Sequence, residues 1–497
     1  MITYADYLRR AARRWPERTA VVSPSASVTF AGLLASAEGL AAGLRARGLG
    51  VGDRVADLRE NSVESVVTDF GCALAGVTRV TVNPRSSDEE IAFVLRDSRP
   101  SLLLADGASA RRAAAAGLDR LVGDVLAELP SATGPRAEAA VVRDEDVLAL
   151  RYTGGTTGRP KGALRTHGHQ LWVATNVLLD LCDLRESDVL LHTQPLSHGA
   201  HVFVLPCVMR GTTQVVLPRF DPAEVLRTIT EHGVTVVKCV PTALHRLLDH
   251  LDREPAALGT LRQIIYGAAP IPEVVLTRAL DRFGPILSQT YGQTEAPATV
   301  SALTVEDHRR AMNGERHLLR SAGRPYSTVD VRIVDGEGRE LPAGETGEVC
   351  VRGPMTMSRY WERDGSPVDD AGYVRTGDVG YLDAESYLYL VDRSRDVIIC
   401  GGYNVYPREV EEVLYTHPGV SEVVVVGLPD AEWGDRVVAA VVPRGTPDLT
   451  ELLRHCRDRL STYKVPREIR LVESLPKTAA GKQLRREVAE VLRGGRG

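Results

Sequence analysis

Apolar residues in the first three hundred positions alternate between helical and strand spacing. Positions 31–49 carry apolar residues at helical spacing, whereas 101–105 form a short apolar run that is typical of a buried strand. Further strands are expected at 147–152, 189–191, 213–217, 234–240 and 263–266. Strands that alternate with helices favour a largely parallel sheet, whose carboxyl ends commonly bind ligands. The pattern therefore predicts an α/β fold for this part of the chain.

Two segments depart from this alternation of helices and strands. Positions 107–143 are rich in alanine, arginine and glycine, which indicates a variable surface segment. From about residue 320 to 392, glycine-containing turns separate short strands such as 329–334 and 348–352. Closely spaced strands and turns predict a β-rich segment there.

A second αβ pattern begins near Asp396. It includes an expected strand at 423–426 and an expected helix at 449–460. A chain of 497 residues is too long for one hydrophobic core, so its length predicts two to four domains.

The composition excludes several classes of protein. Hydrophobic residues make up 43% and charged residues 25%, which is typical of a soluble globular protein. The net charge of −5 gives no general attraction to nucleic acid or to anionic membranes. No apolar run approaches the ~18 residues that cross a membrane, and the first residues lack the layout of a signal peptide. We expect a cytoplasmic protein with no nucleic-acid partner and no membrane insertion.

The spacing of the cysteines and the scarcity of lysine limit the kinds of functional site that the chain could contain. None of the seven cysteines forms a CxxC pair, so buried thiols in a reducing cytoplasm are expected rather than a zinc site. Only five of the sixty basic residues are lysine. Lysine is a compact charge whereas arginine is a wide, flat fork, so lysine is expected to survive where only the compact charge fits. The five are Lys161, Lys238, Lys464, Lys477 and Lys482.

The strongest local motif is residues 152–162, with the sequence YTGGTTGRPKG. Four glycines let backbone N–H groups approach an anion, and three threonine hydroxyls and Lys161 add donors and charge. The loop is not a Walker A motif, because Arg159 and Pro160 precede the lysine and no Ser or Thr follows it. An ordinary turn needs only one or two such residues, so the segment predicts a phosphate-binding loop.

A second motif combines 289–295, QTYGQTE, with the small-residue turn 266–270, YGAAP. An aromatic ring can stack on a nucleobase, and the Glu295 carboxylate suits Mg²⁺. Each string alone is also compatible with a simple strand end.

Three further motifs follow in the last 120 residues. Thr376-Gly377-Asp378 and the segment 391–396 supply an aspartate and Arg393, which could bind the two hydroxyls of a ribose, although an aspartate at a turn more often caps the backbone. The others are 401–407, which leads into a helix from Arg408, and the loop 476–482, which carries two of the five lysines.

Taken together and in this order, the five motifs resemble the ANL superfamily of acyl- and aryl-CoA synthetases, peptide-synthetase adenylation domains and luciferases. The resemblance covers essentially the whole chain. It implies an α/β fold with a large N-terminal domain of αβ layers and a β-rich subdomain at 1–393. A hinge at 394–395 and a small, mobile α+β C-terminal domain at 396–497 would follow.

The resemblance also implies roles for individual residues. The phosphate loop would be Thr153, Gly154, Gly155, Thr156, Thr157, Gly158 and Lys161. Adenine would lie against Gly267, Ala268, Ala269, Gln289, Tyr291 and Gly292. Asp378 and Arg393 would bind the ribose, and Glu295 would hold Mg²⁺ with Thr157 or Thr294 nearby. Lys482 would reach the substrate carboxylate and the α-phosphate. His198 would be a gate between nucleotide and acyl pockets, and Gly402 and Trp433 would lie in the region that receives coenzyme A.

The implied activity is ATP-dependent ligation of a carboxylic acid to coenzyme A through an acyl-adenylate, with release of pyrophosphate. Two alternatives use the same machinery: an enzyme that loads a carrier protein, and one that activates nitrite to diazotise an aromatic amine. A catalytically dead nucleotide-binding module is disfavoured, because every charged residue that the motifs require is present. Ser197, where many relatives have an aromatic residue, and Arg395, at the hinge, depart from the family pattern. The sequence does not identify the acid.

Overall fold

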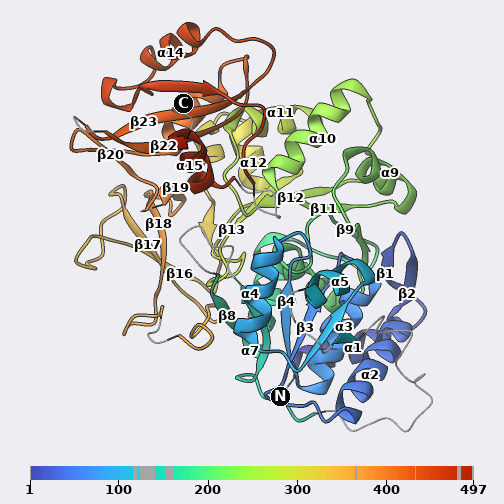
Figure 1. Cartoon of the computed structure of the whole chain (residues 1–497). Helices are drawn as coiled ribbons and strands as arrows, with labels where there is room; N and C mark the ends of the chain where they lie inside the picture. The colour runs from blue at the N-terminus through green and yellow to red at the C-terminus, as the bar shows by residue number, and fades with distance from the viewer. Residues whose placement is uncertain are drawn as a thin grey trace.

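Four β-sheets organise the part of the chain that the computed structural model describes, which comprises residues 2–115, 121–122, 140–152, 160–363, 367–393, 395–430, 433–477 and 483–494 (Figure 1). Two large sheets with parallel cores are built from residues 19–325. The two smaller sheets, drawn from orange to red in Figure 1, follow in residues 330–471. The expected α/β class is confirmed.

The largest sheet has nine strands in the order β15-β14-β13-β12-β11-β9-β10-β1-β2. They are β15 (Arg324–Pro325), β14 (Ser301–Leu303), β13 (Leu287–Tyr291), β12 (Gln263–Gly267), β11 (Val236–Cys239), β9 (Val189–His192), β10 (Thr213–Val216), β1 (Thr19–Ser23) and β2 (Ala26–Thr29). The strands from β13 to β1 run parallel, so their carboxyl ends meet at one edge.

A second sheet has six strands in the order β6-β5-β3-β4-β7-β8. They are β6 (Leu121–Val122), β5 (Leu102–Ala105), β3 (Arg54–Leu58), β4 (Thr78–Val82), β7 (Val147–Tyr152) and β8 (Gly162–Thr166). Only β8 is antiparallel to its neighbour, and it forms a hairpin with β7 around the expected phosphate loop.

The strands expected from the apolar runs are present, but they belong to two sheets and not to one. The N-terminal hairpin of β1 and β2 joins the sheet that is otherwise built from residues 189–325, with β1 paired to β10. Short apolar strands fit any parallel neighbour, so their sequence does not specify the partner. The expected surface segment after residue 107 also begins as a helix, because Ala113 packs into the core beside the six-stranded sheet.

Two smaller sheets follow. The first is antiparallel, with β16 (Asp330–Val334), β17 (Gly347–Arg352), β18 (Val374–Leu382) and β19 (Leu388–Arg393) in sequence order, which confirms the expected β-rich segment. The second has β21 (Tyr403–Val405), β20 (Ile398–Cys400), β23 (Gly434–Pro443), β22 (Val420–Asp430) and β24 (Glu468–Leu471). In the second sheet β23 is central and pairs with β20, β22 and β24.

Helices cover the sheets, and several begin at residues whose side chains cap them. The α-helices are α1 (Tyr4–Arg14), α2 (Phe30–Ala46), α3 (Val63–Ala75), α4 (Asp88–Ser98), α5 (Gly107–Ala115), α7 (His167–Asn176), α8 (Val204–Arg210), α9 (Pro222–His232), α10 (Pro241–Arg253), α11 (Glu273–Phe283), α12 (Val305–Met312), α13 (Pro407–Tyr415), α14 (Leu449–Arg457) and α15 (Arg485–Gly494). Short helical segments are η1 (Val177–Leu181), η2 (Gly199–Phe203), η3 (Arg316–Arg320) and η4 (Thr462–Lys464). Asp221, for example, accepts a hydrogen bond from the N–H of Glu224 and starts α9. Among the described residues, no helix is long and apolar enough to cross a membrane.

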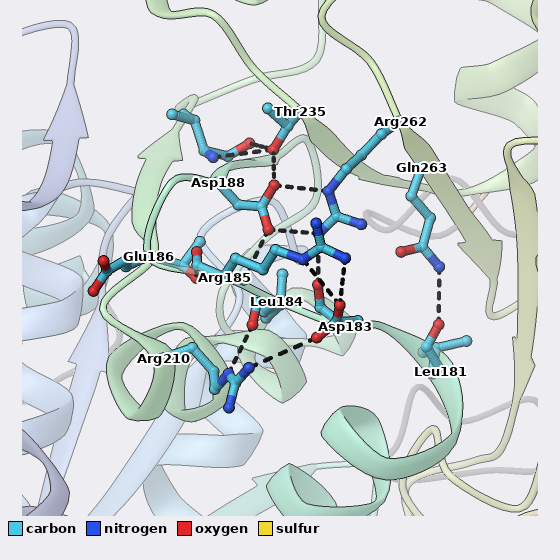
Figure 2. A network of polar contacts seen from close by, with 12 residues as sticks. Leu181, Asp183, Leu184, Arg185, Glu186, Asp188, Arg210, Thr235, Arg262 and Gln263 are labelled. Atoms are coloured by element: carbon cyan, nitrogen blue, oxygen red, sulfur yellow. Dashed lines mark hydrogen bonds and ion pairs between the residues drawn. The ribbon is translucent and has the colours of Figure 1, made fainter.

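Polar side chains align the amino ends of three parallel strands (Figure 2). Asp188, Thr235 and Arg262 directly precede β9, β11 and β12. The Asp188 carboxylate accepts hydrogen bonds from the Thr235 hydroxyl at 2.7 Å and from Arg262 Nε at 2.7 Å. Burial opposes ionisation of this carboxyl, but the Arg262 and Thr235 donors outweigh it and lower its pKa. The network therefore fixes the relative register of strands whose opposite ends form the site.

A buried charge network connects α1 and α3 with η2. Arg79 lies 2.6 Å from Asp57 and 2.8 Å from Asp69, and all three are buried. Asp69 also accepts a hydrogen bond from the Tyr4 hydroxyl, and its Oδ2 lies 2.8 Å from Nε2 of His201 in η2. Burial keeps the imidazole neutral by lowering the pKa of His201 to about 4. Burial would raise the pKa of Asp69, but His201 and Arg79 hold it well below its usual range.

Asp69→Asn should lower the free energy of unfolding by about 3–5 kcal/mol at neutral pH, because it removes one of the two buried carboxylates that compensate the Arg79 guanidinium. The native pKa of Asp69 is depressed, so its contribution is complete above the unfolded-state pKa of about 3.9 and is lost as the pH falls below it. Denaturant unfolding at pH 7 and pH 3.5 measures both effects. Asp252→Asn, which removes the largely exposed partner of Arg278, is the control and should cost under about 1 kcal/mol. Equal losses of unfolding free energy in the two variants would contradict a stabilising role of the buried charge network.

Candidate active site

A cavity of about 990 Å³ opens where the carboxyl ends of β12 and β13 face the C-terminal part of the chain. One wall comes from the start of α10, the loops after β12 and β13, and strands β18 and β19. The opposite wall comes from α13, α15 and β22. A ligand in this cavity would contact both parts of the chain at once.

Small residues form the edge of the cavity beside β12 and β13. The residues expected around adenine are Gly267, Ala268, Ala269, Gln289, Tyr291 and Gly292, and all except Gly267 line the cavity. A Cβ on Gly267 would lie 2.2 Å from the carbonyl oxygen of Thr290, so no larger residue fits there. Ala268 follows with a positive φ of 69°, which turns the chain sharply. The turn leaves room for a flat group beside the Tyr291 ring.

Asp378, Arg393 and Tyr291 meet at the base of the cavity. Asp378 and Arg393 are directly opposite each other on β18 and β19, and Arg393 Nε lies 2.9 Å from Asp378 Oδ1. The Tyr291 hydroxyl donates to Asp378 Oδ2 at 2.5 Å. Burial and the Asp378 charge raise the pKa of Tyr291 well above its usual value, so the hydroxyl keeps its proton. The structure therefore brings together the residues expected at the adenine and at the ribose.

Glu295 lies close to Lys161, although 134 positions separate them in the sequence. The Tyr360 hydroxyl donates to Glu295 Oε1 at 2.6 Å, and the Lys161 ammonium lies 5.2 Å from the centre of the Tyr360 ring. Tyr360 itself is held by a β-bridge to Ala163 in β8. A carboxylate and a cation thus stand at the base of the phosphate-loop hairpin.

The donor set around Glu295 fits Mg²⁺. The Tyr360 hydroxyl occupies one carboxylate oxygen and leaves the other available to a cation. Among the described residues, no group of three or more His, Cys, Asp or Glu side chains could hold a metal. A single carboxylate matches Mg²⁺, which keeps several waters and binds substrate phosphates rather than a full protein cage. Thr294 lies beside Glu295 in the same partly exposed loop.

The C-terminal wall presents charged side chains to the cavity. Arg395 lines it, and burial together with the neighbouring Arg393 lowers the pKa of its guanidinium, while the charges of Asp378 and Glu295 act in the opposite direction. Lys477 and Gln483, which stand on either side of residues 478–482, line the cavity as well. Residues 478–482, which include Lys482, are called the lysine loop below.

Lys161, Thr294 and Glu295 do not line the cavity, and three further expected residues, His198, Gly402 and Trp433, also lie outside its lining. His198 precedes η2, where its carbonyl accepts a hydrogen bond from Arg151, and burial lowers the pKa of its ring to about 4. Gly402 and Trp433 lie together beside the turn between β20 and β21, where the Gly401 N–H donates to the Trp433 carbonyl at 2.8 Å. None of the three is among the residues that line the cavity.

Several expected residues lie outside the described part of the chain, and their roles stay predictions. They are Thr153, Gly154, Gly155, Thr156, Thr157, Gly158 and Lys482. Their described neighbours are informative. Tyr152 and Gly162 are paired at the end of the β7–β8 hairpin, and Lys477 and Gln483 are joined by a β-bridge on the cavity wall.

Two residues of the site were missed or given another role at the sequence level. Tyr360 lies 65 positions from Glu295 in an unremarkable loop, so no local pattern could identify it. Arg395 was expected only as a hinge residue, but it also lines the cavity. The one available signal was its position two residues after Arg393.

Comparisons with known proteins agree with this geometry. Residues 8–361 match the AMP-binding enzyme family, and residues 409–482 match the AMP-binding enzyme C-terminal domain. A feruloyl-CoA synthase from Amycolatopsis sp is 39% identical over 485 residues, covering 96% of this chain and 97% of that protein. A 2-succinylbenzoate–CoA ligase from Bacillus licheniformis is 34% identical, covering 98% of this chain and all of that protein.

Solved structures are similar over almost the whole chain. The o-succinylbenzoate CoA synthetase of Bacillus subtilis, solved with an acyl-adenylate intermediate, has a TM-score of 0.87 and 32% identity and covers 97% of each chain. An amide bond synthetase from Marinactinospora thermotolerans has a TM-score of 0.88 and 32% identity, covering 98% of this chain and 99% of that one.

The chain therefore belongs to the AMP-binding enzyme family, the ANL superfamily of adenylate-forming enzymes. Within it, the chain is an AMP-forming acid–CoA ligase that uses ATP, Mg²⁺ and coenzyme A and acts through an acyl-adenylate.

Glu295→Ala should lower acid-dependent pyrophosphate release by about 10²-fold or more, because the phosphates lose the carboxylate that holds their cation. Tyr360→Phe keeps the carboxylate but removes the donor that orients it, so the Mg²⁺ concentration for half-maximal activity should rise by about tenfold. Tyr7→Phe removes a hydroxyl far from the cavity and is the control. A Tyr360→Phe enzyme with an unchanged Mg²⁺ requirement would contradict this arrangement.

Proposed function

We propose that the cavity is the adenylation site and that the acid is aromatic. The observation that carries the first part is the group formed by Asp378, Arg393 and Tyr291, which faces the two residues that flank the lysine loop. The second part is supported by relatives named as ligases of ferulate, 2-succinylbenzoate and indoleacetate.

In this proposal the N-terminal wall holds ATP. The Tyr291 ring and the turn at Ala268 enclose adenine, while Asp378 accepts hydrogen bonds from the ribose hydroxyls and Arg393 fixes the carboxylate. The residues of the phosphate loop and Lys161 contact the β- and γ-phosphates. Mg²⁺, when held by Glu295 with Thr157 or Thr294 nearby, neutralises phosphate charge.

The substrate carboxylate then attacks the α-phosphorus, and pyrophosphate leaves with the electrons of the broken P–O bond. Negative charge gathers on the α-phosphate during this step, and the Lys482 ammonium stabilises it. In the second step a coenzyme A thiolate attacks the acyl carbon, and AMP leaves. Coenzyme A would approach past Gly402 and Trp433, with His198 between the acyl and nucleotide pockets.

The two steps need different groups beside the same adenylate, so we propose that residues 396–497 move as a unit against residues 1–393. The supporting observation is that β19 ends at Arg393 in one sheet and β20 begins at Ile398 in another. Arg395 would be the pivot. We also propose a cytoplasmic location, because all seven cysteines are free and buried and a reducing compartment keeps them so.

Pyrophosphate release measured over a panel of aromatic and fatty acids, with and without coenzyme A, tests the function. Thioester formation with an aromatic acid is the expected result. Activity that requires a carrier protein would favour the carrier-loading function, and activity with nitrite in place of an acid would favour the diazotising function. No release with any acid would overturn the proposal.

Lys482→Ala should slow adenylate formation by about 10²–10³-fold, because one donor to the developing charge is lost. The same variant, given pre-made aryl-adenylate and coenzyme A, should form thioester at close to the wild-type rate. Lys464→Ala, at a lysine that pairs with Glu409 away from the cavity, is the matched control. Loss of both half-reactions in Lys482→Ala would show that the lysine serves both steps or is structural.

Arg395→Pro should slow thioester formation more than adenylate formation, because proline fixes φ and hinders rotation at the pivot. Arg395→Ala must be measured beside it, since both variants remove a charge that lines the cavity. The ratio of the two half-reaction rates should fall about tenfold or more in the proline variant relative to the alanine variant. The same ratio in both variants would rule out a pivot at this residue.

A further inference from the structure

Lys238 is a buried lysine with no hydrogen-bond partner among the residues that the structure describes. Lys238 is 2% exposed, and its Nζ has no hydrogen-bond acceptor in the described part of the chain. Burial lowers the pKa of the ammonium to about 8, so it is still largely charged at neutral pH. An uncompensated buried charge is strongly unfavourable, and natural cores normally pair or replace it.

The position of Lys238 places it below the site. It lies near the carboxyl end of β11, between His192 of β9 and Ile265 of β12. Two residues later Val240 caps α10, whose first residues Pro241 and Thr242 line the nucleotide cavity.

The direction of the side chain follows from the alternation of strand residues. Val237 and Cys239 pack against α9, α10 and α11, so Lys238 points to the opposite face of the sheet, together with Val236. Val236 and Ile265 on that face belong to the cluster that also contains Phe203 of η2. The Lys238 side chain therefore lies on the face of the sheet where Val236 and Ile265 pack into that cluster.

The side chains next to Lys238 on the adjacent described strands provide no counter-charge. Burial lowers the pKa of His192 to about 4, so its ring is neutral. Its Nε2 pairs with Gln214 Oε1 at 3.1 Å, which leaves His192 Nδ1 and Gln214 Nε2 without partners as well. Three polar side chains on adjacent strands thus present unpaired atoms to the same face of the sheet.

Two of the other described lysines, Lys464 and Lys477, have a carboxylate partner. Lys464 pairs with Glu409 at 2.6 Å, and Lys477 pairs with Glu422 at 2.7 Å. A lysine kept only to fill space at position 238 would be worse than methionine or leucine, which have a similar volume and no charge to bury. The missing partner is therefore best sought in a ligand.

We propose that Lys238 pairs with a second acidic oxygen of the substrate acid, a phenol or a second carboxylate, carried at the end of the molecule away from the reacting carboxyl. The inference rests on the proposed function, because it requires the acid to lie beside the nucleotide cavity. A carboxylate would form an ion pair with the ammonium. A phenol would share one proton with the amine, as phenol and amine or as phenolate and ammonium. His192 and Gln214 would supply further hydrogen bonds to the same group.

The test compares matched acids in wild type and in Lys238→Met. The probes are benzoate and cinnamate, each bare, with a para-hydroxyl and with a para-carboxylate, measured by pyrophosphate release. Wild type should use the substituted member of at least one series with a kcat/KM about 10²-fold above the bare acid, because an unfilled polar site rejects the analogue that lacks its partner. Lys238→Met should lose about that factor for the substituted acid and change less than about threefold for the bare one. A comparison of the para-hydroxyl acids with the para-carboxylate acids identifies which oxygen Lys238 binds.

Lys464→Met is the matched control and should leave every ratio unchanged. Equal use of bare and substituted acids by the wild type, or a preference that persists in Lys238→Met, would overturn the role of Lys238 while leaving the ligase function intact. No pyrophosphate release with any probe would instead overturn the proposed aromatic specificity. Thermal unfolding keeps a folding defect separate: Lys238→Met should melt at or above the wild-type temperature, since it removes a buried charge, and a lower melting temperature would indicate a structural lysine.

Discussion

The ion pair between Asp378 and Arg393 joins three parts of the chain at one point. It pairs β18 with β19, and the Tyr291 hydroxyl connects the same carboxylate to the end of β13 in the nine-stranded sheet. Arg393 is also the last residue of β19, so the chain leaves for the C-terminal sheet from this pair. The base of the cavity and the starting point of the C-terminal part are therefore set by one buried carboxylate, whose orientation depends on donors from two sheets.

Charge also fixes the C-terminal wall against that point. Arg485 at the start of α15 pairs with Glu411 of α13 and lies 3.7 Å from Asp396. The backbone N–H of Arg408 donates to Asp392 on β19 at 3.0 Å. These contacts link α13 and α15 to the strand that carries Arg393. They are polar, which is compatible with the proposed movement of residues 396–497.

Several buried charges in the described part of the chain have an opposite charge beside them. Arg79 pairs with both Asp57 and Asp69, Asp57 also pairs with Arg59, and Asp188 is held by Arg262. Among these, the desolvation of each charge is offset by an opposite charge nearby. Lys238 lacks such a partner among the described residues, and it lies beside the site rather than in the interior of a helical layer.

The sequence by itself determined the α/β class and the β-rich segment, and it predicted which groups bind the nucleotide. Apolar spacing is a local property of the chain. Asp378 and Arg393 could be proposed as partners because each stands in a short, recognisable string. These features depend on neighbours within a few positions, which a linear pattern records.

Only the tertiary structure decided which strands pair, and which distant side chains complete the site. The division of the parallel strands into two sheets follows from long-range packing, since short valine-rich runs fit many neighbours equally well. Tyr360 reaches Glu295 from 65 positions away, and no local string contains both. The burial of Lys238 could not be predicted either, because a sequence shows that a lysine is rare but not that its ammonium is buried without a partner among the described residues. Pairing and burial are properties of three-dimensional neighbours, and those neighbours exist only once the chain has folded.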